Sequence, residues 1–261
     1  MEWRGVVEDM QNDSQNYIEK RRFFDKVLTI YGRNPIIEAL ENSSLSIYRL
    51  HLSSSNKNAQ VLEKMVEIAK KRGIEILYHD KKSLSRISKN SKQDQGVALD
   101  IELEHFTRED EFLASSDSYR VLALDGITNP QNLGMIIRSA MAGSIDAILL
   151  PGSKNLQISP LVIKASVGTI FEMTIIRSDK LSKSLQNFKS QGAKLYTLSS
   201  YAQNSYKEQE YTEKSIFILG NESFGVSPEI EKISDKKIKI PMNRGVESLN
   251  VAVTASLLAF M

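Results

Sequence analysis

Three polar segments in the second half of the chain each follow an apolar run that could form a buried strand. The last of them, Ile240 to Ala255, reads I-P-M-N-R-G-V-E-S-L-N-V-A-V-T-A. Ser248 and Asn250 are expected to open an apolar helix that runs to the end of the sequence. A helix amino terminus offers free N–H groups, a positive dipole end and small capping side chains, so it can hold a polar ligand or a reacting oxygen. Taken alone, the pattern is more often an ordinary helix cap.

Two companion segments favour a functional site. Leu124–Ala140 reads L-D-G-I-T-N-P-Q-N-L-G-M-I-I-R-S-A and carries Asn132 and Arg138. Phe217–Ser227 reads F-I-L-G-N-E-S-F-G-V-S and carries Glu222. Each lies just after the carboxyl end of an expected strand, which is where open α/β sheets place their sites. Three such strand ends in one half of a chain are hard to explain as unrelated turns.

Together these segments resemble the signature motifs of the SpoU branch of the SPOUT RNA methyltransferases. The matching patterns are N-x-G-x-x-x-R, L-G-N-E-x-x-G, and I-P-M followed by S-L-N-V, in the family's order and over roughly residues 120–261. Upstream, Y-G-R-N-P-I-I-E-A-L and Q-G-V-A-L resemble the small RNA-binding domain of its ribosomal RNA members. The resemblance implies a deep carboxyl-terminal trefoil knot and a homodimer with the site near the interface.

The same resemblance implies transfer of a methyl group from S-adenosylmethionine to a ribose 2′-hydroxyl in RNA. Because a guanidinium keeps its proton in proteins, we expect Arg138 to hold the adjacent phosphate and stabilise the developing alkoxide rather than act as a base. The proton would leave through that phosphate, Ser248 or water. The residues that match the family's catalytic positions are Asn132, Arg138, Glu222, Ser248 and Asn250.

Donor binding is expected to use strand ends and the segment before the last helix, where apolar side chains would enclose the adenine and backbone groups would read its edge. For Ile240, Met242 and Leu249 the alternative is an ordinary place in the core. The expected donor-binding residues are Leu198, Leu219, Gly220, Ile240, Met242, Ser248 and Leu249.

Composition narrows the chemistry further. The 261 residues include no cysteine, which removes disulfides, thiolate catalysis and cysteine-ligated metal from consideration. His51, His79 and His105 lack ligand-like spacing, so no metal is expected. No run of about 18 apolar residues is present, so we expect no membrane span. The absence of cysteine is consistent with the cytoplasm, which is the expected location.

Positive charge gathers in the first part of the chain. Residues 64–92 hold nine basic and three acidic side chains, a net charge of +6. Such a cluster could face RNA phosphates, although a solvated helix face is an equally good interpretation. Because few aromatic residues accompany the charge, we expect contacts with the backbone and shape of RNA there rather than base stacking. The residues expected to bind RNA are Lys70, Lys71, Arg72, Lys81, Lys82 and Arg86.

The sequence pattern predicts four parts: an extension over 1–28 with a helical pattern from Tyr17 to Leu28, a small α/β domain over 29–104, a linker over 105–119, and a catalytic domain over 120–261. In the small domain we expect helices at 35–40 and 59–72 and strands at 47–52, 74–78 and 96–103. In the catalytic domain we expect strands at 120–124, 147–150, 172–176, 194–198, 215–219 and 237–240, and helices at 132–142, 159–166, 180–191, 227–233 and 248–260.

Regular alternation of short apolar strands and helices predicts a parallel sheet covered on both faces. No G-x-G-x-x-G follows the first strand of the catalytic domain, which argues against a dinucleotide site and the Rossmann methyltransferase layout.

Three functions remain open. The favoured one is a ribosomal RNA ribose methyltransferase acting on a guanosine of the large-subunit RNA, because a separate small domain precedes the catalytic one. The second keeps the chemistry with tRNA as substrate. The third is a catalytically silent RNA-binding protein on the same fold.

Overall fold

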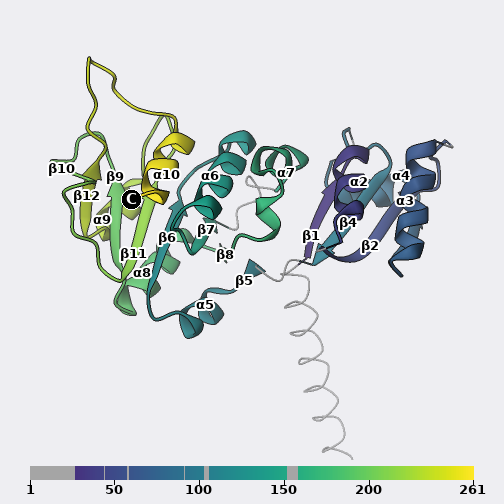
Figure 1. Ribbon diagram of the computed structural model, residues 1–261, viewed down its shortest axis with the longest axis horizontal. Coiled ribbons are helices and arrows are strands. Elements are labelled where there is room, and N and C mark those ends of the chain that lie inside the picture. The colour runs from purple at the N-terminus through teal and green to yellow at the C-terminus, as the bar shows by residue number, and fades with distance from the viewer. Residues whose placement is uncertain (1–26, 44, 58, 91, 103–105, 152–157) are drawn as a thin grey trace, which may run out of the picture. The chain divides into compact units, whose positions relative to one another are not determined.

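The computed structural model describes residues 27–261 apart from 44, 58, 91, 103–105 and 152–157 (Figure 1). The chain divides into two compact units, 1–104 and 105–261. The helix expected over 17–28 lies outside the described residues except for Val27 and Leu28. Those two residues begin a strand, because Val27–Tyr31 pairs with a strand from the end of the first unit.

The described residues of the first unit form a four-stranded sheet with three helices. β1 (Val27–Tyr31) and β2 (Ser46–Ser53) lie antiparallel to β4 (Val97–Glu102), and β3 (Glu75–His79) lies parallel to β2, in the order β1-β4-β2-β3. The helices are α2 (Arg33–Glu41), α3 (Gln60–Lys71) and α4 (Lys81–Ser88). α3 buries Leu62, Met65 and Ala69, which recur at helical spacing on one side.

Helix α4 was not expected, because its sequence K-K-S-L-S-R-I-S is poor in apolar residues. Asp80 caps it by accepting a hydrogen bond from the backbone N–H of Ser83 at 2.8 Å. Leu84 and Ser88 are its buried residues. The sequence feature that could have predicted this helix is the capping aspartate, which follows an apolar strand.

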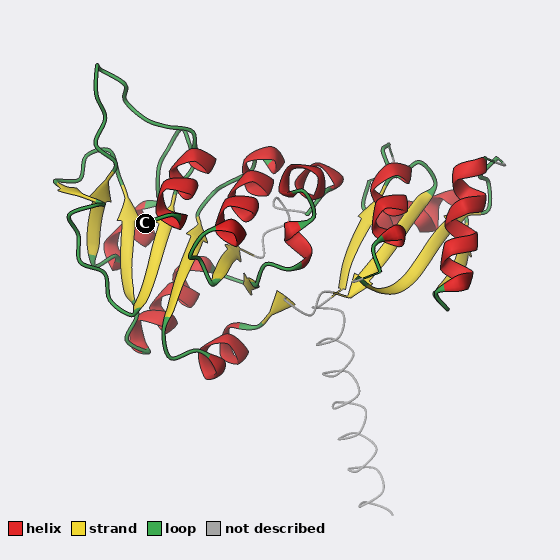
Figure 2. Ribbon diagram, in the orientation of Figure 1, coloured by secondary structure: helices red, strands yellow, loops and turns green. Residues whose placement is uncertain are grey.

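The second unit is an eight-stranded parallel sheet, as the βα alternation predicts (Figure 2). Its order is β10-β12-β9-β11-β6-β7-β8-β5, and every neighbouring pair is parallel. The strands are β5 (Phe106–Thr107), β6 (Tyr119–Leu124), β7 (Ala147–Pro151), β8 (Ile175–Ser178), β9 (Lys194–Leu198), β10 (Asn204–Ser205), β11 (Lys214–Leu219) and β12 (Lys236–Lys239).

Helices cover both faces of this sheet. On one face α6 (Pro130–Ala142) packs against α7 (Pro160–Ser166) and α10 (Val251–Ala259) (Figure 2). The other face is covered by α8 (Leu181–Ser190) and α9 (Pro228–Ile233), and side chains of both join the buried cluster over β6 and β11. The sheet is thus the middle of three layers and has two cores.

Several expected boundaries differ from the structure. The segment expected to be a linker contains α5 (Glu109–Ser115) and β5, and β5 pairs with β8, so these residues belong to the second unit. A 3-10 helix at Thr169–Phe171 displaces the strand expected at 172–176 to 175–178. The last helix begins at Val251 rather than Ser248. The knot implied by the resemblance stays a prediction.

Gly134 allows α6 and α7 to approach closely. A Cβ atom there would lie 2.5 Å from the Cβ of Ala165 and 2.7 Å from the carbonyl oxygen of Val162. Both distances are far below van der Waals contact, so a larger residue would push the helices apart. The glycine of N-x-G-x-x-x-R is therefore required by packing, on the helix that also carries Asn132.

Candidate active site

Three polar side chains from the three motifs meet at the carboxyl edge of the large sheet. Asn132 Nδ2 donates to Glu222 Oε1 at 2.7 Å. Asn250 Nδ2 lies 3.0 Å from the same oxygen and 3.1 Å from Asn132 Oδ1. One carboxylate oxygen thus receives both amides, and the two amides are also joined to each other. We call Asn132, Glu222 and Asn250 the amide–carboxylate cluster.

Two members of the cluster are fixed by helix amino termini. Asn132 stands in the first turn of α6, where Asn129 Oδ1 accepts from the N–H groups of Gln131 and Asn132. Its side chain is only 7 % exposed. Asn250 is the N-cap of α10, and its Oδ1 accepts from the N–H of Ala252 at 2.8 Å. The backbone of Asn132 is therefore held by the Asn129 side chain, and the side-chain amide of Asn250 is held by the backbone of α10. The two amides are also held by each other.

Glu222 is presented by a tight turn after β11. Asn221 and Gly225 exchange backbone hydrogen bonds of 2.9 and 2.8 Å. Asn221 Oδ1 accepts from the N–H of Ser223, and its Nδ2 donates to the carbonyl of Gly126 on the neighbouring motif. A Cβ at Gly220 would meet the carbonyl carbon of Gly225 at 2.1 Å, so only glycine permits this approach.

Sequence reasoning missed three residues that build this edge. Asn129 caps α6, and Asn221 ties the second motif to the first. Asp125 Oδ2 accepts from the N–H of Ser227 at 2.7 Å and so links the ends of β6 and β11. All three are Asp or Asn directly after a strand or before a helix, a position typical of side chains that bond to the backbone.

The other two expected catalytic residues, Arg138 and Ser248, are not members of the cluster. Arg138 is exposed on α6, on the same outward side as Met135 and Ala142. Ser248 is exposed in the segment that precedes α10. Their catalytic roles stay predictions.

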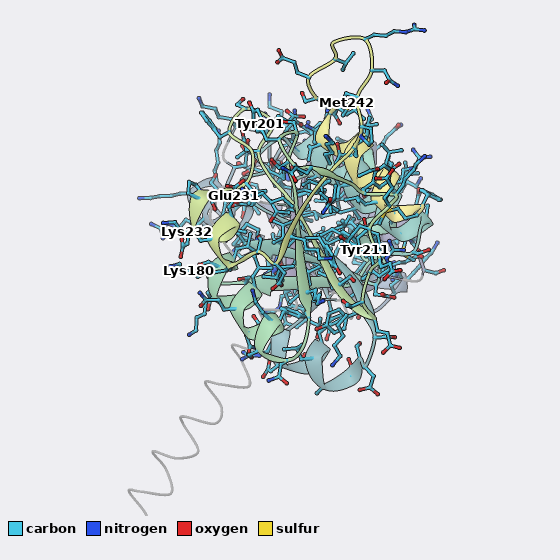
Figure 3. The ribbon with its side chains drawn as sticks, turned by 90° about the vertical axis from the view of Figure 1, so that its left-hand side faces the viewer. Lys180, Tyr201, Tyr211, Glu231, Lys232 and Met242 are labelled. Carbon is cyan, nitrogen blue, oxygen red and sulfur yellow. The ribbon has the colours of Figure 1, made fainter. Side chains whose placement is uncertain are left out.

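The expected donor-binding residues surround the same edge. Leu198 ends β9 and Leu219 ends β11, and these two strands are neighbours. Leu219 is fully buried, so its side chain belongs to the core. Ile240, Met242 and Leu249 lie between β12 and α10 and are half-buried. Figure 3 shows Met242 at the same end of the view as Tyr201.

Two cavities lie away from the cluster. One, of about 480 Å³, is lined by α3 and the segment after β2 in the first unit. The other, of about 640 Å³, is lined by Tyr119, Arg120 and Met261 among others, at the amino end of β6. Neither is lined by a residue of the amide–carboxylate cluster. The described part of the chain contains no group of three His, Cys, Asp or Glu side chains placed to hold a metal ion.

The expected RNA-binding residues divide between two helices of the first unit. Lys70 and Lys71 lie in the last turn of α3, where Lys71 pairs with Glu67, and α4 carries Lys81, Lys82 and Arg86. Arg72 donates to three carbonyl oxygens, those of Leu40, Asn42 and Leu45, at 2.8, 3.0 and 2.5 Å. Its guanidinium therefore has a structural function, fixing the end of α2.

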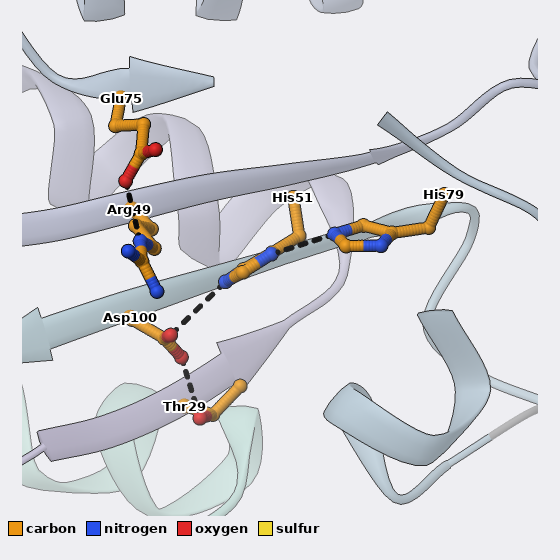
Figure 4. Close-up of polar contacts among 6 residues, drawn as sticks. All are labelled: Thr29, Arg49, His51, Glu75, His79 and Asp100. Carbon is orange, nitrogen blue, oxygen red and sulfur yellow. Dashed lines mark hydrogen bonds and ion pairs between the residues drawn. The ribbon is translucent and has the colours of Figure 1, made fainter. Parts of the chain in front are cut away.

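A polar network crosses the sheet of the first unit (Figure 4). Thr29 Oγ1 donates to Asp100 Oδ1 at 2.6 Å, and Asp100 Oδ2 lies 3.0 Å from His51 Nε2. His51 Nδ1 lies 2.9 Å from His79 Nε2. Burial lowers the pKa of His79, the neighbouring His51 lowers it further, and Asp80 opposes the shift.

Within the residues that the structure describes, no helix has both the length and the apolar character needed to cross a bilayer.

Comparison with known proteins gives two family matches. Residues 119–260 match the SpoU rRNA Methylase family, and residues 29–107 match the RNA 2′-O ribose methyltransferase substrate-binding domain. A tRNA/rRNA methyltransferase of Mycobacterium leprae, itself uncharacterized, is 29 % identical over 88 % of this chain and 74 % of its own length. A Bacillus subtilis protein named for the TrmH family of tRNA/rRNA methyltransferases is 28 % identical, over 88 % of this chain and 93 % of its own.

Solved structures show the same fold. The AdoMet-bound rRNA methyltransferase from Sinorhizobium meliloti has a TM-score of 0.63 and 21 % identity, and covers 92 % of this chain and 88 % of its own. AviRb from Streptomyces viridochromogenes, a SpoU methyltransferase in complex with AdoMet, has a TM-score of 0.63, 18 % identity and coverage of 92 % and 90 %. These findings confirm the resemblance seen in the three motifs. The chain belongs to the SpoU rRNA methylase family, with the substrate-binding domain of RNA 2′-O-ribose methyltransferases ahead of its catalytic domain.

Proposed function

We propose that this RNA 2′-O-ribose methyltransferase uses S-adenosylmethionine to methylate ribosomal RNA, at a guanosine of the large-subunit RNA. The observation that carries the proposal is the amide–carboxylate cluster, which unites one residue from each motif at the sheet edge. The SpoU rRNA Methylase match over residues 119–260 supports ribosomal RNA as the substrate, and the substrate-binding match over residues 29–107 supports an RNA substrate methylated at a ribose 2′-oxygen.

The donor supplies an electrophilic methyl group on a sulfonium. The chain must orient the ribose and help its hydroxyl lose a proton, because a sugar hydroxyl is a poor nucleophile. Asn132, Glu222 and Asn250 provide hydrogen-bonding groups whose positions are fixed by one another. Arg138 would hold the phosphate next to the ribose and stabilise the developing alkoxide. The proton would leave through that phosphate, Ser248 or water.

The residues at the sheet edge fit the chemistry of the donor. Adenine and a methionine side chain need apolar walls and backbone hydrogen-bonding groups. Leu198, Ile240, Met242 and Leu249 are apolar and half-buried, so a ligand could cover what remains exposed. The backbone from 240 to 250 lies outside any helix or strand, which leaves N–H and C=O groups for the adenine edge.

A second copy of the chain is the proposed partner of the face formed by α6, α7 and α10. Apolar side chains on all three helices are exposed there, and Arg138 stands among those of α6. A dimer through this face would cover the apolar surface and place Arg138 at the interface between the two copies. The exposed apolar residues of these helices are Met135, Met141, Leu161 and Val253.

Of the two other functions, one has some support and the other has an observation against it. The relatives from Mycobacterium leprae and Bacillus subtilis carry names that allow tRNA as well as rRNA, so tRNA is the second candidate substrate. A silent RNA-binding protein would have no need of the cluster, whose three side chains are complete and mutually bonded.

The test is a tritium-transfer assay with labelled S-adenosylmethionine. Purified protein is incubated with unmodified ribosomal RNA and, separately, with unmodified tRNA. We expect label in ribosomal RNA alone, recovered as an alkali-resistant dinucleotide because a methylated 2′-oxygen cannot attack its phosphate. Arg138→Ala should lose most of this transfer, and Arg138→Lys, which keeps the charge and loses the fork, should not restore it.

Label in tRNA alone would keep the reaction and overturn the ribosomal substrate. Donor binding without label in either RNA would point to a ribonucleoprotein particle as substrate. No donor binding would favour the silent RNA-binding protein. Full activity of Arg138→Lys would contradict the proposed role of the guanidinium fork.

A further inference from the structure

Two aromatic side chains of the second unit are almost completely exposed. Tyr201 is 95 % exposed and Phe224 is 90 % exposed. Exposed single apolar residues are common on protein surfaces. These two are distinguished by where they lie and by how firmly the backbone beneath them is held.

Phe224 projects from the turn that also presents Glu222. The turn is closed by the backbone exchange between Asn221 and Gly225, and the N–H of Phe224 itself lies 3.3 Å from Asn221 Oδ1. Asn221 is anchored in turn to the carbonyl of Gly126. The backbone of Phe224 is therefore fixed by the same hydrogen bonds that fix Glu222, two residues away.

Tyr201 projects from a turn after β9. The carbonyl of Ser199 accepts from the N–H of Ala202 at 3.2 Å, and Ser199 Oγ accepts from the N–H of Tyr201 at 3.4 Å. Ser199 is itself tied to β12 through a 3.0 Å hydrogen bond from its N–H to the carbonyl of Ile238. The backbone that carries the Tyr201 ring is therefore also held by hydrogen bonds.

Both aromatic residues lie at the carboxyl edge of the sheet. β9 and β11 are parallel neighbours, and neighbouring strands are separated by about 4.8 Å. Tyr201 comes three residues after Leu198, the end of β9, and Phe224 comes five residues after Leu219, the end of β11. The rings thus follow adjacent strands at the edge where the amide–carboxylate cluster lies.

A planar ring in this position suits a nucleobase. Every base has a π face, and unpaired bases of RNA stack on exposed aromatic side chains. Phe224 has no hydrogen-bonding group, so it can contact a base face but cannot bind a phosphate. The amide–carboxylate cluster would contact the ribose. The base is covalently attached to that ribose, so it would lie nearby.

We propose that Phe224, assisted by Tyr201, is a stacking surface for an unpaired base at or next to the methylated nucleotide. The inference rests on the proposed function, in which RNA is the substrate. It differs from the expectation for the first unit, where charge accompanied by few aromatic residues favours contacts with the backbone and shape of RNA. It implies that the target ribose is recognised in a single-stranded or splayed-out segment.

Substitutions at position 224 test the ring directly. Phe224→Ala removes it, Phe224→Leu keeps apolar character without a π face, and Phe224→Tyr keeps the ring. Ser223→Ala is the matched control, because it changes an exposed side chain of the same turn and leaves the backbone hydrogen bonds in place. Tyr201→Ala tests the contribution of the Tyr201 ring to the stacking surface.

The measurements are kcat/KM for an unmodified ribosomal RNA transcript, the Kd for S-adenosylmethionine by calorimetry, and the molecular mass by light scattering. We expect Phe224→Ala and Phe224→Leu to lower kcat/KM about 10- to 100-fold, the size of one lost stacking contact. Phe224→Tyr and Ser223→Ala should stay within about twofold of the wild type. The donor Kd and the mass should not change.

A fluorescence probe reports stacking without catalysis. The chain has a single tryptophan, Trp3, so a Trp3→Phe, Phe224→Trp double variant carries one reporter at the proposed platform. Stacking on a base should quench its emission strongly when the ribosomal RNA transcript is added. The same reporter at Tyr78, in the Trp3→Phe, Tyr78→Trp variant, serves as an exposed reference in the other unit.

Quenching at position 224 greater than at position 78 supports the stacking surface, even if the wild type transfers no label and the proposed function itself fails. Wild-type kcat/KM in Phe224→Leu would overturn the inference while leaving the methyltransferase intact. A fall in mass to that of a monomer in Phe224→Ala would also overturn it, because the ring would then cover a second copy of the chain.

Discussion

Asn250 performs two tasks with the two ends of one amide. Its Oδ1 caps α10 through the N–H of Ala252, and its Nδ2 donates to Glu222 and Asn132. The first task stabilises a helix and the second completes the amide–carboxylate cluster. Because the tasks use different atoms, substitution can separate them.

We expect Asn250→Ser to keep the fold and lose activity. Serine caps helices about as well as asparagine, so the melting temperature should change little. Its short hydroxyl cannot replace the amide donor, and misplaced groups at a reacting centre can cost about 10²-fold in rate. Methyl transfer to ribosomal RNA and a thermal melt measure the two effects.

Asn250→Ala is the companion variant, and it should additionally lose about 1 kcal/mol of stability because the cap disappears. Full activity in the serine variant would show that the cluster does not need this amide.

Individual site residues could be predicted from the sequence, but the contacts between them could not. Asn132, Glu222 and Asn250 were expected because each lies in a recognisable motif. That Glu222 Oε1 would accept from both amides could not be predicted, since the partners are 90 and 28 positions apart and meet only through the strand order. Ser248 was placed in the first turn of the last helix, but the helix begins three residues later.

At the scale of elements, three strands of the first unit are joined by side chains as well as by backbone. Asp100 on β4, His51 on β2 and His79 on β3 form a continuous polar chain between strands (Figure 4). His51 and Asp100 are buried, and His79 is half-buried. Proton uptake by His79 is therefore coupled to the stability of the sheet.

Acidification should destabilise the first unit through His79. Its pKa in the folded protein lies below the ordinary value near 6.5, chiefly because of burial and then because of His51. The unfolded chain therefore binds more protons than the folded chain in this range. The stabilising contribution is complete above about pH 6.5 and is lost as the pH falls through the folded pKa.

Calorimetric melts of the full chain between pH 7.5 and pH 5.5 measure this effect. His79→Gln keeps an amide donor facing His51 without a titrating ring, so the transition of the first unit should depend less on pH in this variant. An identical pH dependence in both proteins would exclude His79 as the source.

Elements with a strong period were predicted well, and short or polar ones were not. β9 was expected at Lys194–Leu198 and is found there. β5 and β10 have two residues each and carry no periodic signal. The first two residues of β1, Val27 and Leu28, were interpreted as the end of a helix, because they continue the apolar pattern of the preceding segment and the pairing of β1 with β4 is not visible locally.

At the scale of the whole molecule, the second unit has apolar surface on the face formed by α6, α7 and α10. Met135, Leu161 and Val253 come from α6, α7 and α10, and α6 packs against the other two helices. Burial of such a surface is the usual driving force of stable self-association. We therefore expect a dimer in solution, with a mass twice the 29.4 kDa of the chain.

A charge on this face should give a monomer. Met135→Glu combined with Leu161→Glu places carboxylates where apolar surface would be buried, and desolvating them is costly. Sedimentation velocity should show the single-chain mass, and methyl transfer should fall if Arg138 acts at the boundary between copies. Tyr78→Glu is the control, since it charges an exposed side chain of the first unit. A double variant that remains dimeric would exclude this face.

The distances along the chain between the members of the cluster have a consequence for when the enzyme becomes active. Asn132 is separated from Glu222 by 90 positions and from Asn250 by 118. Loops of that length close slowly and are costly in entropy, whereas helices and turns form early. A second unit that is only partly folded therefore cannot hold the site, however much secondary structure it has acquired. Methyl transfer therefore requires a completely folded second unit. RNA that encounters an incompletely folded enzyme stays unmodified.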